Sequence, residues 1–568
     1  MKTLPTKRLM TRFVREVLAW FGHVKKDVLA ARWELLALLG LISPMLLHGF
    51  LGSIEATWGN GLYWFNLLTS ILWIGLMWGI PVSGRIKRWG FILLGVTVLA
   101  EWFMVIHFRT RLSSGYLFLL FSNASEWDEF TLTYSRTVIP LALLGALFWG
   151  ACWFGMGGSP KPKLVARIPL LLLSLLALLG AYGGVFIRGI LGNGLHHNAL
   201  VLSAWDIANK EMGAPMGVFF QAAVVGKTQS ETARYVSLRR GQSLQATQSV
   251  RTPGEIYVLV IGESSRPQNW GLLGYARNTT PRLAGLSNLV PFPHVLPPAC
   301  VTAISVPGWL SFQRMDDWVG VISHKSVISA FRSAGFNTHW LSTQEMDVWA
   351  GGCIPVVAEE AKTRRYFDRC FDGVLVDEVR KLVGNRSSKP MLVVLHTKGS
   401  HFRFDRRYPG QFAKFPTQGV NYCTGLVNSY DNSILYTDWV LAEISKILEH
   451  SGRPAVLAYA SDHGENLYDD SNAHFGHGIG TKYDLAAACF FWCSKSFVSA
   501  KPNKLGALAS NAHKRVSGSS LAHTLAGLAD LQSEFYRDDF DLASFSFEQK
   551  PRMYQLHDDL RIEAPPAD

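Results

Sequence analysis

Five apolar runs occupy the first third of the chain, and each is about as long as a helix that crosses a bilayer. A hydrocarbon core of roughly 30 Å is spanned by about 20 predominantly apolar residues in a helix. Successive runs without a small-residue cleavage site are typical of a polytopic membrane domain rather than of a cleaved signal peptide. The pattern therefore predicts five transmembrane helices, at Trp33–Leu51, Leu62–Ile80, Gly90–Phe108, Val138–Met156 and Pro169–Arg188.

A different pattern begins after Pro253, where short β-rich runs alternate with helical stretches. This alternation predicts an α/β domain with a mainly parallel sheet. A long amphipathic helix is expected at Gly425–Glu449, because apolar residues recur there at helical spacing. The expected strands are Ile256–Ile261, Thr338–Leu341, Met391–His396, Ala455–Ala460 and Ala487–Trp492.

The two patterns divide the chain into three parts. Residues 1–190 are expected to form the membrane domain, and residues 251–568 the α/β domain. Between them, residues 191–250 form a linker with an expected helix at Ala204–Val225. Composition agrees with a membrane protein, because only 17% of the residues are charged, against about a quarter in typical soluble domains.

Basic residues gather in three segments next to the apolar runs: the leader before residue 33 and the loops at 85–88 and 161–167. Together these segments carry the whole formal net charge of +12. Because basic loops stay in the cytoplasm, the N-terminus is expected there, and five spans place the chain after about residue 190 outside. The remainder is electrically balanced, so the sequence pI of about 9.3 does not indicate a nucleic-acid partner.

Six of the seven cysteines fall in the part of the chain that is expected outside. An oxidising compartment permits three disulfides among them, and the sequence does not choose the pairing. The alternative is that several are small buried side chains, above all those in the apolar strand near residue 490. The six are Cys300, Cys353, Cys370, Cys423, Cys489 and Cys493.

Polar residues cluster directly after three of the expected strands, at 262–265, 397–401 and 461–465. Open α/β sheets bind ligands beyond the carboxyl ends of their strands, so these three loops are expected to converge. Glu263, Asp462 and His463 offer two carboxylates and an imidazole, a set that suits a divalent metal such as zinc or manganese. An isolated Asp-His-Gly is a weak signal, since caps and turns favour the same residues. The three loops together favour the metal site.

A hydroxyl nucleophile would complete such a site, and six side chains are candidates. A hydroxyl needs activation by a base or a metal, so the useful one is expected at a helix start near the metal. Thr302 fits that description, whereas each of the others is more typical of a helix cap or a turn. The six candidates are Ser264, Ser265, Thr279, Thr280, Thr302 and Ser305.

The segments around these residues resemble the phosphoethanolamine transferases, membrane enzymes of the alkaline phosphatase and sulfatase superfamily. The resemblance extends over nearly the whole chain and implies five spans followed by a periplasmic sulfatase-like domain, hence a multi-pass protein of the cell inner membrane. The matching segments are VLVIGESSR (258–266), WGLLGY (270–275), NTTP (278–281), TAISVP (302–307), WLSTQ (340–344), KGSH (398–401), RYP (407–409), SYDNSILYTD (429–438), SDHGE (461–465) and HG (477–478).

Carried over to this sequence, the resemblance implies a catalytic zinc held by four residues, with manganese the second choice. These are Glu263, Thr302, Asp462 and His463, with Thr302 as the nucleophile.

Two further histidines, His401 and His477, match family residues that bind the phosphoethanolamine group or a further zinc. His474 lies close to His477 in the sequence, and the Gly478 that follows favours His477 for this role.

The implied reaction moves phosphoethanolamine from phosphatidylethanolamine to Thr302 and then to a lipopolysaccharide, at lipid A or a core sugar, or to a related glycan. The alternatives are a phosphoglycerol transferase, a phosphodiesterase or sulfatase-like hydrolase, and a non-catalytic membrane sensor. A sulfatase needs a Cys or Ser in a C/S-x-P-x-R frame; Ser265–Asn269 lacks the final Arg, and Cys300 lacks the Pro.

Glu101 is an unusual residue for a membrane span, because a carboxylate in the hydrocarbon region is costly. We expect it to face an interior pocket and to meet the ammonium group of the lipid donor. The alternative is a structural partner such as an Asn or a backbone group.

Overall fold

A computed structural model describes residues 32–50, 61–80, 84–108, 112, 127–157, 168–169, 171–180, 222, 233–344, 353–385, 389–471, 473–556 and 559–562. The chain divides into two compact units, residues 1–120 with 128–227 and residues 121–127 with 228–568. The basic leader and the expected helix Ala204–Val225 lie outside the described residues, apart from residue 222 of the helix. The expected boundaries at residues 190 and 250 therefore stay predictions.

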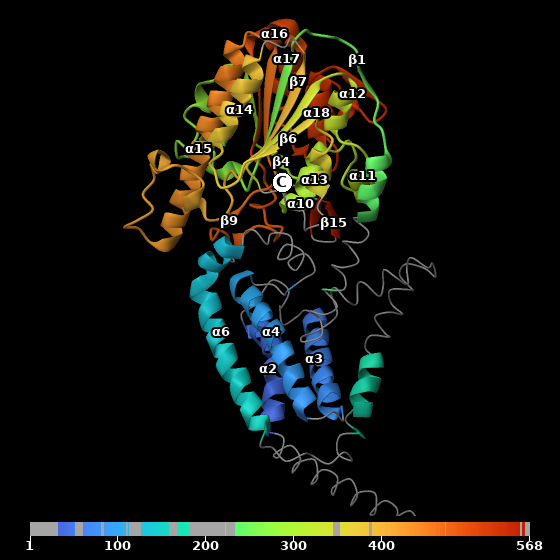
Figure 1. Cartoon of the computed structure of the whole chain (residues 1–568), viewed down its shortest axis with the longest axis vertical. Coiled ribbons are helices and arrows are strands. Elements are labelled where there is room, and N and C mark those ends of the chain that lie inside the picture. The colour runs from blue at the N-terminus through green and yellow to red at the C-terminus, as the bar shows by residue number, and fades with distance from the viewer. Residues whose placement is uncertain are drawn as a thin grey trace, which may run out of the picture. The chain divides into compact units, whose positions relative to one another are not determined.

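Four long helices of the first unit coincide with four of the five apolar runs (Figure 1). A shorter apolar helix, Leu171–Gly180, falls within the fifth run. Among the described residues, Arg85–Ile106 and Tyr134–Met156 are long and apolar enough to cross a membrane. The count of five spans therefore stays a prediction. The four helices are α2 (Arg32–Phe50), α3 (Gly61–Gly79), α4 (Gly84–Phe108) and α6 (Trp127–Gly157).

Glycines allow the helices of the first unit to approach one another closely. A Cβ on Gly40 would lie 2.5 Å from the ring of Phe148, and one on Gly95 would lie 2.7 Å from the indole of Trp149. Small residues at helix contacts are typical of membrane bundles. Large apolar side chains face outward instead, as with Leu147, which is 72% exposed. This distribution suits a lipid environment.

Glu101 is buried in α4, and its Oε2 accepts a hydrogen bond of 3.1 Å from the backbone N–H of Leu112. A backbone partner is the alternative that the sequence left open for this carboxylate. The contact with a donor ammonium group stays a prediction.

A seven-stranded mixed sheet forms the centre of the second unit, in the order β3-β11-β8-β2-β7-β5-β6. The strands from β8 to β6 are parallel, while β11 runs antiparallel to both of its neighbours. The five expected strands are confirmed, with ends that differ by at most two residues. The strands are β2 (Ile256–Gly262), β3 (Leu289–Phe292), β5 (Asn337–Ser342), β6 (Thr363–Tyr366), β7 (Met391–His396), β8 (Ala455–Ser461) and β11 (Cys489–Cys493).

Helices cover both faces of this sheet, which explains why β2, β7 and β8 are apolar and buried along their whole length. Figure 1 shows α14 (Gly373–Gly384) and α15 (Tyr422–His450) on one face and α10 (Thr302–Leu310), α12 (Val327–Ser333) and α18 (Ser520–Leu528) on the other. The long helix expected at Gly425–Glu449 is thus confirmed as α15. The shorter helices are α11 (Trp318–Ser323), α13 (Cys353–Ala358), α16 (Lys495–Ala500) and α17 (Pro502–Asn511).

Four two-stranded sheets lie outside the central sheet. They pair β1 (Ala246–Gln248) with β13 (Leu531–Ser533), β4 (Val295–Leu296) with β12 (Val516–Ser517), β9 (Asn466–Leu467) with β10 (Phe475–Gly476), and β14 (Met553–Leu556) with β15 (Asp559–Ile562).

All seven cysteines are free thiols in the structure. Cys489 and Cys493 are buried in β11, in agreement with the expectation of small packed side chains there.

Candidate metal centre

The three polar loops converge because β7, β2 and β8 are adjacent parallel strands whose carboxyl ends share one edge. The backbone N–H of Asp462 donates to the carbonyl of Gly262 (2.9 Å), and that of Ser400 donates to the carbonyl of Glu263 (3.0 Å). The chain approaches Glu263 closely at Gly399, which has a φ of +44° and where a Cβ would lie 2.9 Å from the Glu263 nitrogen. The loops thus form one continuous hydrogen-bonded layer.

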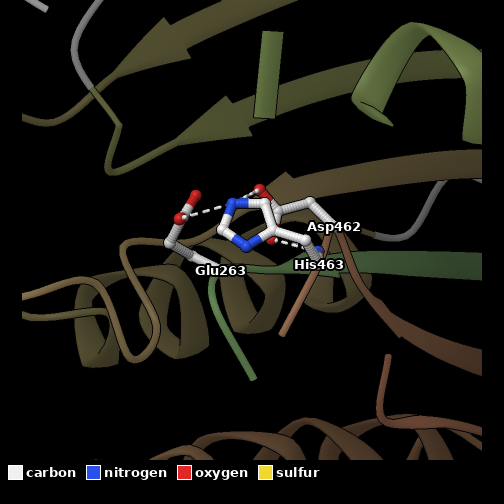
Figure 2. A group of neighbouring side chains, drawn as sticks. All are labelled: Glu263, Asp462 and His463. Carbon is white, nitrogen blue, oxygen red and sulfur yellow. Dashed lines mark hydrogen bonds and ion pairs between the residues drawn. The ribbon is translucent and has the colours of Figure 1, made fainter. Parts of the chain in front are cut away.

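Glu263, Asp462 and His463 meet at this edge with ligand atoms that all lie within 4.8 Å of one another. Figure 2 shows the imidazole between the two carboxylates. Nε2 of His463 lies 3.5 Å from Oε1 of Glu263 and 3.4 Å from Oδ2 of Asp462. All three side chains are buried. The sequence had placed these residues in one site, and the structure brings them together.

The His463 ring presents a lone pair to the two carboxylates. Its Nδ1 lies 2.7 Å from the carbonyl of Gly464, which only accepts hydrogen bonds, so Nδ1 carries the proton. Burial lowers the pKa of His463 to about 4, against the attraction of Asp462, so the ring is neutral near pH 7. Burial alone would raise the pKa of Asp462, but His463 and hydrogen bonds, including one from the Ser264 N–H, lower it overall. The carboxylate is therefore ionised.

Nε2 of His463 and Oδ2 of Asp462 therefore face each other at 3.4 Å without a proton between them. Oδ2 of Asp462 is buried and accepts no hydrogen bond from the described residues. Burying an anionic oxygen without a hydrogen-bond or ion-pair partner costs several kcal/mol. A bound cation would remove this cost. Two carboxylates and a neutral imidazole are a donor set that zinc favours. The residues thus fit a divalent metal at this position.

Thr302 begins α10 and completes the cluster, because its Oγ1 lies 3.3 Å from Oε2 of Glu263 and 3.2 Å from Nε2 of His463. The helix is tied to the same loop, since the hydroxyl of Ser305 and the indole N–H of Trp309 both donate to the carbonyl of Asp462.

Burial separates Thr302 from the other five candidate hydroxyls. Thr302 is partly exposed, whereas the other five are at most 1% exposed. Each of the five also takes part in a hydrogen bond within the fold, as when Ser265 accepts from the indole of Trp270. The five are Ser264, Ser265, Thr279, Thr280 and Ser305.

The two further histidines also lie at the site. The ring of His477 lies 4.2 Å from that of His463 and 6.3 Å from that of His401, measured between centroids. Nδ1 of His477 lies 3.2 Å from Oε2 of Glu465. Burial lowers the pKa of His477, but the attraction and hydrogen bond of Glu465, together with the attraction of Asp462 and Asp484, raise it overall. His474 instead pairs with Asp470 through Nδ1.

The helix motif SYDNSILYTD has a positioning role in α15. Tyr430 donates to the carbonyl of Ser264 (2.6 Å) and accepts from the N–H of Arg266 (3.0 Å), and Ser433 donates to the hydroxyl of Ser400 (2.9 Å). Asp431 accepts from the side-chain amide of Asn269 and from Arg277, while Asn432 accepts from the backbone at 414–415. One buried helix thus fixes the loops after β2 and β7.

Sequence reasoning assigned no role to two polar residues that contact the site. Gln344 follows β5 and donates from Nε2 to Oε2 of Glu263 (2.9 Å) and to the carbonyl of Thr397 (3.0 Å). Glu465 orients His477 as described above. The sequence contained an indication for both residues. Gln344 follows an expected strand at the same sheet edge, and Glu465 belongs to the SDHGE segment.

Known proteins are similar to the part of the chain that carries this site. The sulfatase family matches residues 255–531. Phosphoethanolamine transferase EptA of Escherichia coli O157:H7 is 30% identical over 303 residues, which are 49% of this chain and 54% of that protein. The Kdo(2)-lipid A phosphoethanolamine 7''-transferase of E. coli K12 is 31% identical over 243 residues, 40% of this chain and 41% of that protein. The match thus spans about half the length of these curated relatives or less.

Two solved structures share the fold. The integral membrane lipooligosaccharide phosphoethanolamine transferase A of Neisseria meningitidis has a TM-score of 0.67 and 22% identity, over 89% of this chain and 97% of that one. The zinc complex of the periplasmic domain of EptC from E. coli has a TM-score of 0.52 and 23% identity, over 56% of this chain and 96% of that one. Residues 255–531 of this chain therefore match the sulfatase family, and the proteins to which the chain is similar include phosphoethanolamine transferases.

Proposed function

We propose that this chain transfers phosphoethanolamine from phosphatidylethanolamine, through a covalent ester on Thr302, to a lipopolysaccharide or related glycan acceptor. One observation carries the proposal: of six candidate hydroxyls, the one that is partly exposed contacts the Glu263 carboxylate and the neutral imidazole of His463, which cluster with Asp462. The names of the relatives support phosphoethanolamine as the transferred group, and one of those names contains lipid A.

The metal in this proposal is zinc, and the residues that would hold it are Glu263, Thr302, Asp462 and His463. When bound, a divalent metal supplies positive charge that lowers the pKa of a hydroxyl and stabilises negative charge on phosphoryl oxygens. The zinc complex of the related EptC domain supports this choice over manganese.

In the first half-reaction, the Thr302 hydroxyl loses its proton to solvent, Oγ1 attacks the phosphorus of the donor, and the bond from phosphorus to the diacylglycerol oxygen breaks. The leaving oxygen needs a proton, and His477 is placed to give one because Glu465 raises its pKa. His401 is the second histidine within the site and would contact the phosphoryl oxygens. In the second half-reaction an acceptor hydroxyl gives its proton to His477, which the first half-reaction left neutral, and its oxygen attacks the same phosphorus. The bond from phosphorus to Oγ1 of Thr302 breaks, and Thr302 takes a proton from solvent.

A membrane location supports this chemistry, because the scissile bond of the donor lies at the lipid headgroup. The proposal places the first unit in the cell inner membrane with a cytoplasmic N-terminus, and the sulfatase-family domain in the periplasm. In this proposal Glu101, whose Oε2 accepts from the backbone N–H of Leu112, also meets the ammonium group of the donor.

Diacylglycerol release from defined vesicles tests the proposal. The purified full chain, loaded with zinc, is expected to release diacylglycerol from phosphatidylethanolamine vesicles, with none from Thr302→Ala and a reduced rate from Thr302→Ser. Release from phosphatidylglycerol alone would instead identify a phosphoglycerol transferase. No release from either lipid by metal-loaded protein would overturn the proposal.

A further inference from the structure

Ser264 has an unusual backbone conformation beside the metal centre. It follows Glu263 directly, is fully buried, and has a φ of +54°. Residues with a Cβ rarely adopt this left-handed region, where glycine is free of strain. Strained residues of this kind persist when their surroundings require them, and they cluster at functional sites. A serine at this position therefore needs a reason that glycine would not satisfy.

The contacts of Ser264 supply that reason. Its N–H donates to Oδ1 of Asp462 (3.0 Å), and its hydroxyl donates to Oε1 of Glu263 (2.8 Å). The carbonyl of Ser264 accepts from the hydroxyl of Tyr430 (2.6 Å), so the N–H, the hydroxyl and the carbonyl of Ser264 all have partners. The left-handed conformation thus lets the N–H and the hydroxyl of Ser264 donate to two carboxylates that follow different strands.

These hydrogen bonds fix one oxygen of each carboxylate. Oδ1 of Asp462 receives a second hydrogen bond from the N–H of His463 (2.7 Å), while Oδ2 accepts none from the described residues. The orientation of the carboxylate is therefore set before any metal binds. Because the donors from Ser264 are neutral, they add no positive charge that would oppose the binding of a cation, as an Arg or Lys partner would.

We propose that Ser264 is a positioning residue that holds Glu263 and Asp462 in their metal-binding orientation, and that its hydroxyl is the reason for the strained backbone. The inference rests on the proposed function for the identity of the metal. Loss of the groups that orient metal ligands typically lowers metal affinity by about 10- to 100-fold. The hydroxyl of Ser264 is expected to fall in this range.

Three substitutions separate the hydroxyl from the backbone strain. Ser264→Gly removes both, Ser264→Ala removes only the hydroxyl, and Ser264→Thr keeps both. The zinc Kd of the full chain, measured by competition with a chelating dye, is expected to rise about 10- to 100-fold in the Gly and Ala variants. In the Thr variant it is expected to stay within about threefold of the wild type, because the hydroxyl is retained.

The melting temperature of the metal-free protein gives the second readout. It is expected to stay level or rise for Ser264→Gly, because the strain is relieved, and to fall for Ser264→Ala. A variant that is more stable yet binds zinc more weakly distinguishes positioning from a general effect on folding. Asn288→Gly is the matched control, since Asn288 also has a left-handed φ, +60°, and its carbonyl accepts from Cys493, which pairs with Val456 near the amino end of β8 rather than near Asp462. That variant is expected to change stability without a change in zinc Kd.

A zinc Kd within twofold of the wild type in both the Gly and the Ala variants would overturn the inference. The proposed function is decided by separate measurements. If the wild type binds zinc no better than Asp462→Ala, the metal site fails and the role of Ser264 fails with it. If the wild type binds zinc but releases no diacylglycerol, the transferase proposal fails, and the zinc Kd still decides the role of Ser264.

Discussion

Tyr430→Phe is expected to weaken the domain and its metal centre together. The phenol is fully buried in α15, and its hydroxyl joins two backbone groups of the loop after β2. It donates to the carbonyl of Ser264 and accepts from the N–H of Arg266. Phenylalanine keeps the ring contact with Phe404, whose centroid lies 5.0 Å away, so the substitution isolates the hydroxyl.

The size of the effect follows from the two groups that lose their partner. A buried backbone donor or acceptor left unsatisfied costs about 1–3 kcal/mol. With two such groups the expected loss in the free energy of unfolding is about 2–4 kcal/mol, because the loop regains part of it by relaxing. Relaxation of the loop displaces Glu263, so zinc affinity is expected to fall by about 10-fold as well.

Thermal unfolding of the metal-free full chain and a zinc titration measure the two effects. Ser445→Ala is the control on the same helix, since its buried hydroxyl donates only to the carbonyl of Leu441, which the helix already uses. That control is expected to lose less than about 1 kcal/mol and to bind zinc as the wild type does. A Tyr430→Phe protein that unfolds and binds zinc like the wild type would refute the reasoning.

Three other regions give independent predictions. Burial raises the pKa of Asp541 to about 7, so the folded chain keeps a proton that the unfolded chain loses near pH 4. Thermal unfolding is therefore expected to show that stability falls between about pH 4 and 7, by up to about 4 kcal/mol. Asp541→Asn is expected to flatten this pH dependence. Glu360→Gln is expected to cost about 3 kcal/mol or more in urea unfolding, because it leaves the buried guanidinium of Arg239 without its ion pair of 2.7 Å; an unchanged midpoint would contradict this. Gly399→Ala is expected to lower zinc affinity and stability together, since φ is +44° and the added Cβ meets the backbone of the metal loop; wild-type values for both would contradict the close approach.

The fold near the site was largely predictable because each strand there can be recognised from its own short stretch of sequence. β2, β7 and β8 are continuous apolar runs, and each is followed by a polar loop, so both the strands and the convergence of their ends followed from the sequence. The edge strand β6 was not predicted, because its TRRY sequence is mostly exposed and lacks the apolar signal of a buried strand. The antiparallel direction of β11 was also not predicted, since the direction of a strand leaves little trace in its own sequence.

The same distinction applies to the site. The cluster of Glu263, Asp462 and His463 was predictable from residue type and position. The separation of Thr302 from the other hydroxyls by burial, and the action of Tyr430 on a loop 164 residues earlier in the chain, depend on tertiary contacts. The left-handed conformation of Ser264 likewise appears only once α15 and the loop after β8 pack around it.

Intact-protein mass spectrometry after exposure to phosphatidylethanolamine tests the central claim most directly. Zinc-loaded wild-type protein is expected to carry a covalent phosphoethanolamine group that the peptide spectrum maps to Thr302 and that is absent from Thr302→Ala. A metal-loaded protein that turns over the donor without this adduct, or that carries the adduct on another residue, would contradict it.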